Sequence, residues 1–344
     1  MNLESLLFKA VEKGASDLHL IAGLPPYIRI DGLLQPLGTE IISAKEIDFI
    51  TKEVLGEKDY KRFVLEKNID FAFENNSGNR FRINFFYEKD SPALAARIIP
   101  NEIPTMEDIG MPKIMYDICN LDRGLILVTG PTGCGKSTSL AAMIEYINQN
   151  RCVNIITLED PIEFIFHPKK SIIRQRQLRS DMLSFQDGLV HALRQDPNVI
   201  MVGEMRNLET IATTITLAET GHLVFATLHT YSAGQTIDRI IDIFPPYQQN
   251  QIRMQISITL KAVLTQRLLP AVGGGRVAAR ELLINTPAVA NLIRENKISQ
   301  IKTVIQTSAK EGMLTMENSL NKLYKDGLID KETLDSNLIM QNIF

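Results

Sequence analysis

The 344-residue chain is poor in cysteine, contains no tryptophan and carries no excess of positive charge. Its formal net charge of −3 offers no broad basic surface, which argues against a motor that works on nucleic acid and predicts no nucleic-acid partner. The three cysteines, Cys119, Cys134 and Cys152, form no CxxC pair. We therefore expect neither structural zinc nor a disulfide framework, and the sparse cysteines favour a reducing compartment.

Long apolar runs and a basic leader are also missing. No run approaches the roughly 18–20 apolar residues that cross a bilayer. Glu4 stands where a signal peptide would carry positive charge, and no cleavage site follows it. We therefore expect a cytoplasmic protein with no direct membrane insertion, which another protein must hold at the membrane if it works there.

The length of the chain exceeds the usual size of a single hydrophobic core, which predicts more than one domain. Residues 1–100 combine an amphipathic helix with several short strand-like runs, a pattern typical of a small α+β domain with an antiparallel sheet. Residues 101–120 are interrupted by proline and glycine. We interpret this segment as a linker between two domains.

From residue 121 the pattern changes to short, β-branched-rich apolar runs that alternate with helical segments. This alternation predicts a three-layer α/β domain over residues 121–270. After Pro245 and Pro246 the chain looks mostly helical, interrupted by a hairpin through Glu281, and residues 271–344 are assigned to a mostly helical C-terminal region. The expected fold class is therefore α/β, preceded by an α+β domain.

The most specific motif is a complete G-x-x-x-x-G-K-[ST] phosphate loop, which lies between a predicted strand and a predicted helix. Its glycines let successive backbone N–H groups converge on phosphates. Lys136 is expected to pair with the β- and γ-phosphates of ATP, and the Ser137 hydroxyl to ligate Mg²⁺. The expected nucleotide-binding residues are Gly130, Pro131, Thr132, Gly133, Cys134, Gly135, Lys136, Ser137 and Thr138.

Polar groups follow three further predicted strands, and in a parallel sheet they would share the edge that carries the phosphate loop. Glu204 ends a Walker B pattern, and a carboxylate at this position can orient the attacking water. The alternative is that Glu204 is only a solvent-exposed glutamate at the end of a strand. Glu159 and Asp160 are expected to position Mg²⁺, Glu159 through a water molecule, or else to cap a helix before Pro161. His229 either contacts the γ-phosphate or is an ordinary core histidine.

Three other residues carry weaker signals. Glu163 is a less specific carboxylate of the same segment, and Cys134 is favoured as a space-filling side chain over an oxidation-sensitive one. His222 starts the strand that His229 ends, so it is expected at the opposite edge of the sheet and, from the residues alone, in a structural role.

Several stretches resemble the secretion-ATPase superfamily, and specifically the PilT family of type IV pilus retraction ATPases. Residues 156–163 (ITLEDPIE) resemble its Asp box, residues 193–206 (LRQDPNVIMVGEMR) its extended Walker B signature, and residues 219–230 its His box. The resemblance implies an N-terminal PAS-like domain, a RecA-like ATPase domain and a helical C-terminal region. It also gives both His222 and His229 weight as His-box residues.

The same resemblance implies a homohexameric ring in which ATP sits between subunits. Its partners would be a pilus inner-membrane platform protein and the pilus machinery, at the inner face of the cytoplasmic membrane. Arginines of the N-terminal domain would reach the nucleotide of a neighbour, and Arg80, Arg82 and Arg97 lie on the strands where such groups are expected. A solvated strand face is the alternative for all three.

Three readings of the function follow. The first is a hexameric ATPase motor for pilus retraction, which the resemblance of residues 291–297 (NLIRENK) and 312–316 (GMLTM) to PilT segments favours. The second is an accessory retraction ATPase or an assembly ATPase of the same superfamily, although assembly ATPases look longer at the N-terminus and carry a tetracysteine zinc element. The third, from a different class, is a RecA-like nucleic-acid motor.

Overall fold

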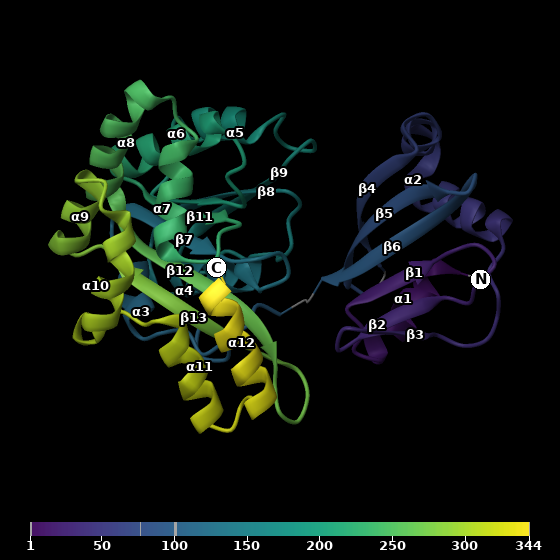
Figure 1. The fold of residues 1–344 in the computed structure, drawn as a ribbon. Coiled ribbons are helices and arrows are strands. Elements are labelled where there is room, and N and C mark those ends of the chain that lie inside the picture. Colours follow the sequence, from purple (N-terminus) through teal and green to yellow (C-terminus); the bar gives the residue numbers. More distant parts are fainter. Residues whose placement is uncertain (1, 76, 100–101, 344) are drawn as a thin grey trace. The chain divides into compact units, whose positions relative to one another are not determined.

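The computed structural model describes residues 2–75, 77–99 and 102–343, and the chain divides into two compact units, Met1–Glu102 and Ile103–Phe344 (Figure 1). Each unit has its own hydrophobic core. Within the described residues no helix is both long enough and apolar enough to cross a membrane.

The first unit is a sheet with two helices packed on one of its faces. Its described strands pair antiparallel in the order β3-β2-β1-β6-β5-β4. Alternate residues such as Leu18, Phe81 and Leu94 are fully buried against the helices, so their neighbours in sequence point to the other face. The elements are α1 (Leu3–Glu12), β1 (Asp17–Leu20), β2 (Tyr27–Ile30), β3 (Leu33–Pro36), α2 (Ala44–Glu66), β4 (Asn68–Glu74), β5 (Arg80–Glu88) and β6 (Ser91–Ile99).

The second unit is built on a mostly parallel sheet whose described strands run in the order β13-β12-β7-β11-β10-β8-β9. Only the β12–β13 pair is antiparallel among these pairs. The strands are β7 (Gly124–Thr129), β8 (Asn154–Glu159), β9 (Ile172–Gln177), β10 (Val199–Val202), β11 (Leu223–Leu228), β12 (Leu260–Pro270) and β13 (Arg276–Ile284).

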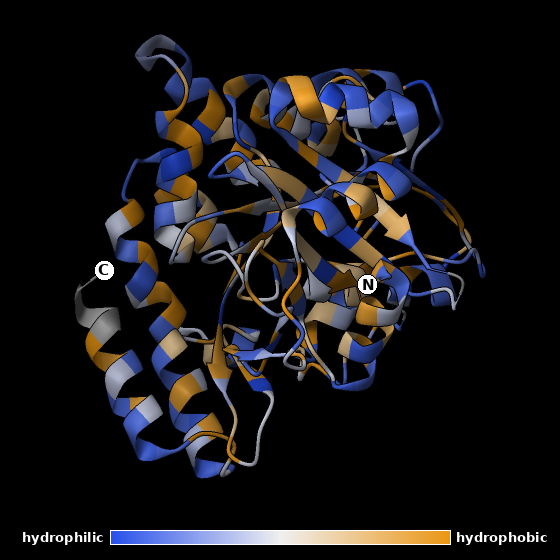
Figure 2. Cartoon of the chain, turned by 90° about the vertical axis from the view of Figure 1, so that its right-hand side faces the viewer, coloured by the Kyte–Doolittle hydropathy of each residue, from blue (hydrophilic) through white to orange (hydrophobic). Residues whose placement is uncertain are grey.

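Helices cover both faces of this sheet, which makes the unit three-layered. Along β7, Leu125 and Leu127 belong to one apolar cluster, whereas Ile126 and Val128 belong to the other. The helices of this unit carry both apolar and polar residues (Figure 2). They are α3 (Ile114–Cys119), α4 (Lys136–Asn150), α5 (Phe185–Ala192), α6 (Leu208–Glu219), α7 (Ala233–Asp242), α8 (Pro246–Thr259), α9 (Pro287–Arg294), α10 (Ile301–Thr307), α11 (Met316–Lys325) and α12 (Lys331–Ile343).

The structure confirms the expected α/β fold and corrects one detail of the C-terminal part. The four predicted apolar strands are β7, β8, β10 and β11, and they lie side by side in parallel. The chain after Pro246 is less helical than expected, because β12 is an eleven-residue strand that extends the sheet beside β7. The expected hairpin is β12–β13, and the proposed division at 270/271 falls within its turn.

Candidate nucleotide site

The phosphate loop joins the carboxyl end of β7 to the start of α4. Gly130, Gly133 and Gly135 have φ values of 143°, 78° and 84°, a region that favours glycine. At Gly130 space is limiting as well, because a Cβ atom would lie 2.3 Å from the backbone oxygen of Gln266 on β12 and 2.7 Å from Cys134 Sγ. The motif glycine at 130 is therefore required by its packing against β12 in addition to its backbone conformation.

Lys136 is buried at the first position of α4, and its ammonium group lies over the loop. Its Nζ atom donates hydrogen bonds to the carbonyl oxygens of Gly130 (2.8 Å) and Pro131 (3.0 Å). Burial lowers the pKa of Lys136, and the nearby carboxylates of Glu204 and Glu163 act in the opposite direction. A positive charge held in a partly desolvated loop is suited to binding a phosphate anion.

Glu204 and His229 join Lys136 in a continuous chain of contacts. His229 follows β11 and places Nδ1 3.4 Å from Lys136 Nζ and Nε2 3.7 Å from a carboxylate oxygen of Glu204, which lies just after β10. The other oxygen of Glu204 pairs with Arg206. Burial and the Lys136 charge lower the pKa of His229, which favours its neutral form. The structure thus brings together the lysine, the histidine and the predicted catalytic glutamate.

Glu159 lies at the carboxyl end of β8 and is almost fully buried. Its carboxylate accepts hydrogen bonds from Thr157 Oγ1 (2.6 Å), Gln175 Nε2 (3.0 Å) and the backbone N–H of Glu163. Burial nevertheless raises the pKa of Glu159 to about 7. The loss of solvation outweighs these hydrogen bonds, so a cation close by would favour the ionised form.

Gln175 is a site residue that the sequence did not reveal. It comes from β9, donates to Glu159 and to the carbonyl oxygen of Phe164 (2.7 Å), and accepts from the N–H of Phe166 (2.9 Å). It thereby fixes the segment after Glu159 to the sheet. No motif marks it, and only the parallel pairing of β8 with β9 places it beside the glutamate.

The remaining motif residues lie outside the contact chain from Lys136 to Glu204, although the Glu163 carboxylate is near enough to act on the pKa of Lys136. The side chains of Asp160 and Glu163 are exposed. His222 lies at the amino ends of β7 and β11, where its carbonyl accepts from the N–H of Gly124 (3.0 Å). Its Nδ1 atom is 2.9 Å from the carbonyl oxygen of Leu217. Within its own subunit, His222 is at the opposite edge of the sheet from the phosphate loop, as the residues alone suggested.

The three candidate arginines of the first unit lie on the sheet face that α1 and α2 do not cover. Arg82 and Arg97 are directly opposite each other on β5 and β6. Arg97 pairs with Asp17 at 3.1 Å, Arg82 with Asp70 at 3.7 Å and Arg80 with Glu74 at 3.8 Å. The Arg97 side chain is the most exposed of the three, at 66%. It is therefore the most accessible to another chain.

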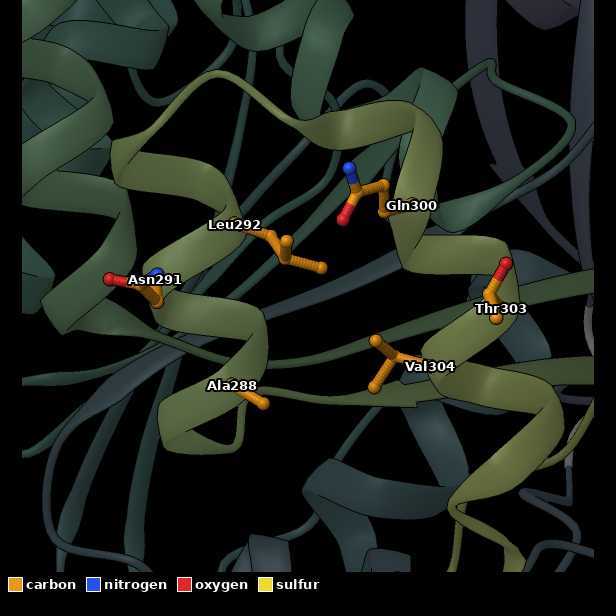
Figure 3. Close-up of a pocket in the computed structure, with 6 residues that line it drawn as sticks. All are labelled: Ala288, Asn291, Leu292, Gln300, Thr303 and Val304. Atoms are coloured by element: carbon orange, nitrogen blue, oxygen red, sulfur yellow. The ribbon is translucent and has the colours of Figure 1, made fainter.

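A cavity of 490 Å³ lies elsewhere, between α9 and α10 (Figure 3). Leu292 and Val304 face each other across it. Its lining residues are Ala288, Asn291, Leu292, Gln300, Thr303 and Val304. None of them is among the predicted nucleotide-site residues, so this cavity is not part of the phosphate site.

Comparison with known proteins agrees with this geometry. Residues 2–274 match the family model of the Type II/IV secretion system protein. The chain is 45% identical over 332 residues, 96% of both chains, to the type IV pilus retraction ATPase PilT of Pseudomonas aeruginosa. It is 47% identical to a twitching motility protein of Neisseria gonorrhoeae, over 91% of this chain and 84% of that one. A crystal structure of the pilus retraction motor PilT with bound ADP has a TM-score of 0.89 and 48% identity, covering 97% of this chain and 96% of that one.

Fold and site define a P-loop ATPase of the RecA-like kind. The chain belongs to the PilT family, within the Type II/IV secretion system ATPases. This confirms the family suggested by the sequence motifs.

Proposed function

We propose that the protein is a homohexameric motor that uses ATP hydrolysis to retract type IV pili. The observation that carries the proposal is the contact chain from Lys136 through His229 to Glu204, at the carboxyl ends of adjacent parallel strands. It supplies a phosphate-binding cation and a water-orienting carboxylate in one site. The match to PilT proteins over nearly the whole chain supports pilus retraction as the work that hydrolysis drives.

The chemistry follows from the contacts of the site. The backbone N–H groups of the phosphate loop bind the phosphates of ATP, and Lys136 exchanges its loop carbonyls for phosphate oxygens. Glu204 orients the attacking water and accepts its proton. His229 is neutral and contacts both Lys136 and Glu204. Binding of the γ-phosphate at Lys136 therefore affects the position of the Glu204 carboxylate through His229.

The site also fits a magnesium ion. Mg²⁺ prefers oxygen ligands, and Ser137 and Glu159 offer a hydroxyl and a buried carboxylate that follow β7 and end β8, two parallel strands whose carboxyl ends lie at the same edge of the sheet. Ser137 would ligate the ion directly and Glu159 would ligate it through water. Asp160, which follows Glu159 in sequence, would help to position the ion. The ion would neutralise charge that develops on the phosphates.

Among the described residues of the second unit, Arg206 is paired with Glu204, and the family resemblance implies that a further arginine reaches the nucleotide from another subunit. We therefore assign Arg80, Arg82 and Arg97 to the neighbouring subunit's nucleotide, with Arg97 first because it is the most exposed. A heterologous interface of this kind forms a ring when the rotation between successive subunits closes. The ring would act at the inner face of the cytoplasmic membrane, bound to a pilus platform protein.

The test is a chromosomal deletion. Loss of a retraction motor should leave cells with excess, immobile pili, and wild-type protein should restore retraction whereas the Glu204→Gln variant should not. Bare cells would contradict retraction and indicate an assembly ATPase. Pili that still retract, but with reduced force, would indicate an accessory motor. Stimulation of the purified ATPase by DNA or RNA would instead support the nucleic-acid reading.

A further inference from the structure

Gln266 is a buried amide in the middle of β12, with 1% of its surface exposed. Its Nε2 atom donates to the carbonyl oxygen of Cys134, in the phosphate loop, at 2.7 Å. Its Oε1 atom accepts from the Ser139 hydroxyl, in the first turns of α4, at 2.8 Å. One side chain thus joins the loop and its helix to a strand more than a hundred residues away in sequence.

The bond to Cys134 has a directional consequence. The carbonyl of Cys134 and the N–H of Gly135 belong to one planar trans peptide, so they point in opposite directions. Holding the carbonyl toward β12 therefore turns the Gly135 N–H away from β12. In a phosphate loop the N–H groups around this motif glycine are the ones that bind phosphate. Gln266 fixes the direction of one of them.

The orientation of the amide is itself fixed. The Cys134 carbonyl can only accept, so it requires the NH₂ end of the amide, and Ser139 donates to the oxygen end. The glycine at position 135 leaves room for this contact, because a Cβ atom there would lie only 3.3 Å from Gln266 Nε2. An apolar side chain of similar volume could fill this place in the core, but it would hold neither partner.

We propose that Gln266 is a positioning residue for nucleotide binding, which presets the Cys134–Gly135 peptide of the phosphate loop before the phosphates arrive. The inference rests on the proposed use of this loop for ATP. A loop that is already in its binding conformation loses less conformational freedom when ligand binds. Removal of the amide should therefore weaken binding of both ATP and ADP, while bound phosphates restore the loop and leave the chemical step largely intact.

The test is the Gln266→Met variant, which keeps most of the volume and removes both hydrogen bonds. We expect KM for ATP and Kd for ADP to rise about tenfold, or about 1.4 kcal/mol, with kcat within about twofold of wild type. A merely structural role predicts the reverse pattern, because partial unfolding lowers the active fraction and hence kcat but leaves KM unchanged. That pattern, or an unchanged KM, would overturn the proposal.

A second variant keeps the inference testable if Gln266→Met folds poorly. Ser139→Ala removes only the hydroxyl that orients the amide and should raise KM by a smaller factor. An unchanged KM in Ser139→Ala alone would contradict the proposal. Where Gln266→Met folds, the same change in that background should have no further effect on KM, because Ser139 acts through Gln266. Additive effects in this double-mutant cycle would contradict the proposal.

The matched control is Asn285→Leu. Asn285 is also a carboxamide that donates to backbone carbonyls, those of Ser257 (3.0 Å) in the last turn of α8 and Leu260 (2.8 Å) at the start of β12. Its loss should lower the melting temperature without changing KM. If wild-type protein hydrolyses ATP while KM of Gln266→Met is unchanged, the positioning role fails and the ATPase assignment stands. If wild-type protein binds no nucleotide, the positioning role of Gln266 and the ATPase assignment both fail.

Discussion

The Glu204→Gln substitution gives the sharpest test of the assigned chemistry. Glutamine has nearly the same shape as glutamate, and its amide oxygen can still accept from Arg206. It cannot accept a proton from water at neutral pH. A positioned general base contributes about 10²–10⁴ in rate, so kcat should fall by at least about a hundredfold, or about 2.7 kcal/mol.

The cost to folding should be much smaller. The Arg206 side chain is 73% exposed, and an ion pair with an exposed partner contributes about 1 kcal/mol or less to stability. The loss of rate therefore exceeds any loss of folded protein, and the two can be separated. ATP binding should persist, since the substitution leaves Lys136 and the phosphate loop unchanged.

The assay combines phosphate release at saturating ATP, equilibrium binding of a fluorescent ATP analogue and thermal melting. Glu209→Gln is the matched control, because Glu209 is an exposed carboxylate in the first turn of α6, close in sequence to Glu204 but not among the residues of the contact chain from Lys136 through His229 to Glu204 and Arg206. It should keep wild-type turnover. Turnover of Glu204→Gln within twofold of wild type would show that another group activates the water.

Three further predictions concern other parts of the structure. Burial raises the folded-state pKa of Glu159 from 4.5 to about 7, so the folded protein loses about 3 kcal/mol of stability relative to the unfolded chain as pH rises through this window. The melting temperature of Glu159→Gln, measured without Mg²⁺, should therefore exceed that of wild type by an increasing margin between pH 5 and pH 8. A difference in melting temperature that does not change with pH would contradict this. Gly130→Ala should lower ATP affinity and melting temperature more than Gly133→Ala, whose added Cβ meets no atom within 4 Å, and equal effects in calorimetry would refute the role of β12 packing. Arg97→Ala should lower the turnover of the purified ATPase by about 10³-fold or more, whereas Arg62→Ala, which breaks an exposed pair on α2, should not. Mixing Arg97→Ala with Glu204→Gln protein should recover part of the activity if the arginine acts on a neighbour's site.

The local motifs were readable from the sequence because their chemistry depends on neighbouring residues. A loop that wraps phosphates needs glycine, lysine and a hydroxyl residue at fixed spacing after a strand. The apolar runs that end in Glu159, Glu204 and His229 indicated parallel buried strands, and the order of the sheet agrees. In such a sheet these ends must share one edge, so sequence order and hydrophobicity were sufficient to gather these groups there.

The supporting contacts were not readable, because they join segments that are distant in the chain. Gln175 and Gln266 belong to no sequence motif. They contact Glu159 and the phosphate loop only because β9 pairs with β8 and β12 pairs with β7. The strand β12 itself was expected within a mostly helical region, since a buried strand and a buried helix segment are hard to tell apart in a short apolar run.

The phosphate loop and the charged groups that accompany it could be predicted from the sequence, since spacing along one segment specifies that chemistry. Tertiary structure alone decided how those groups are held. Burial raises the pKa of Glu159, β12 packs on Gly130, and a distant amide orients the peptide before Gly135, because desolvation and packing depend on which strands become neighbours.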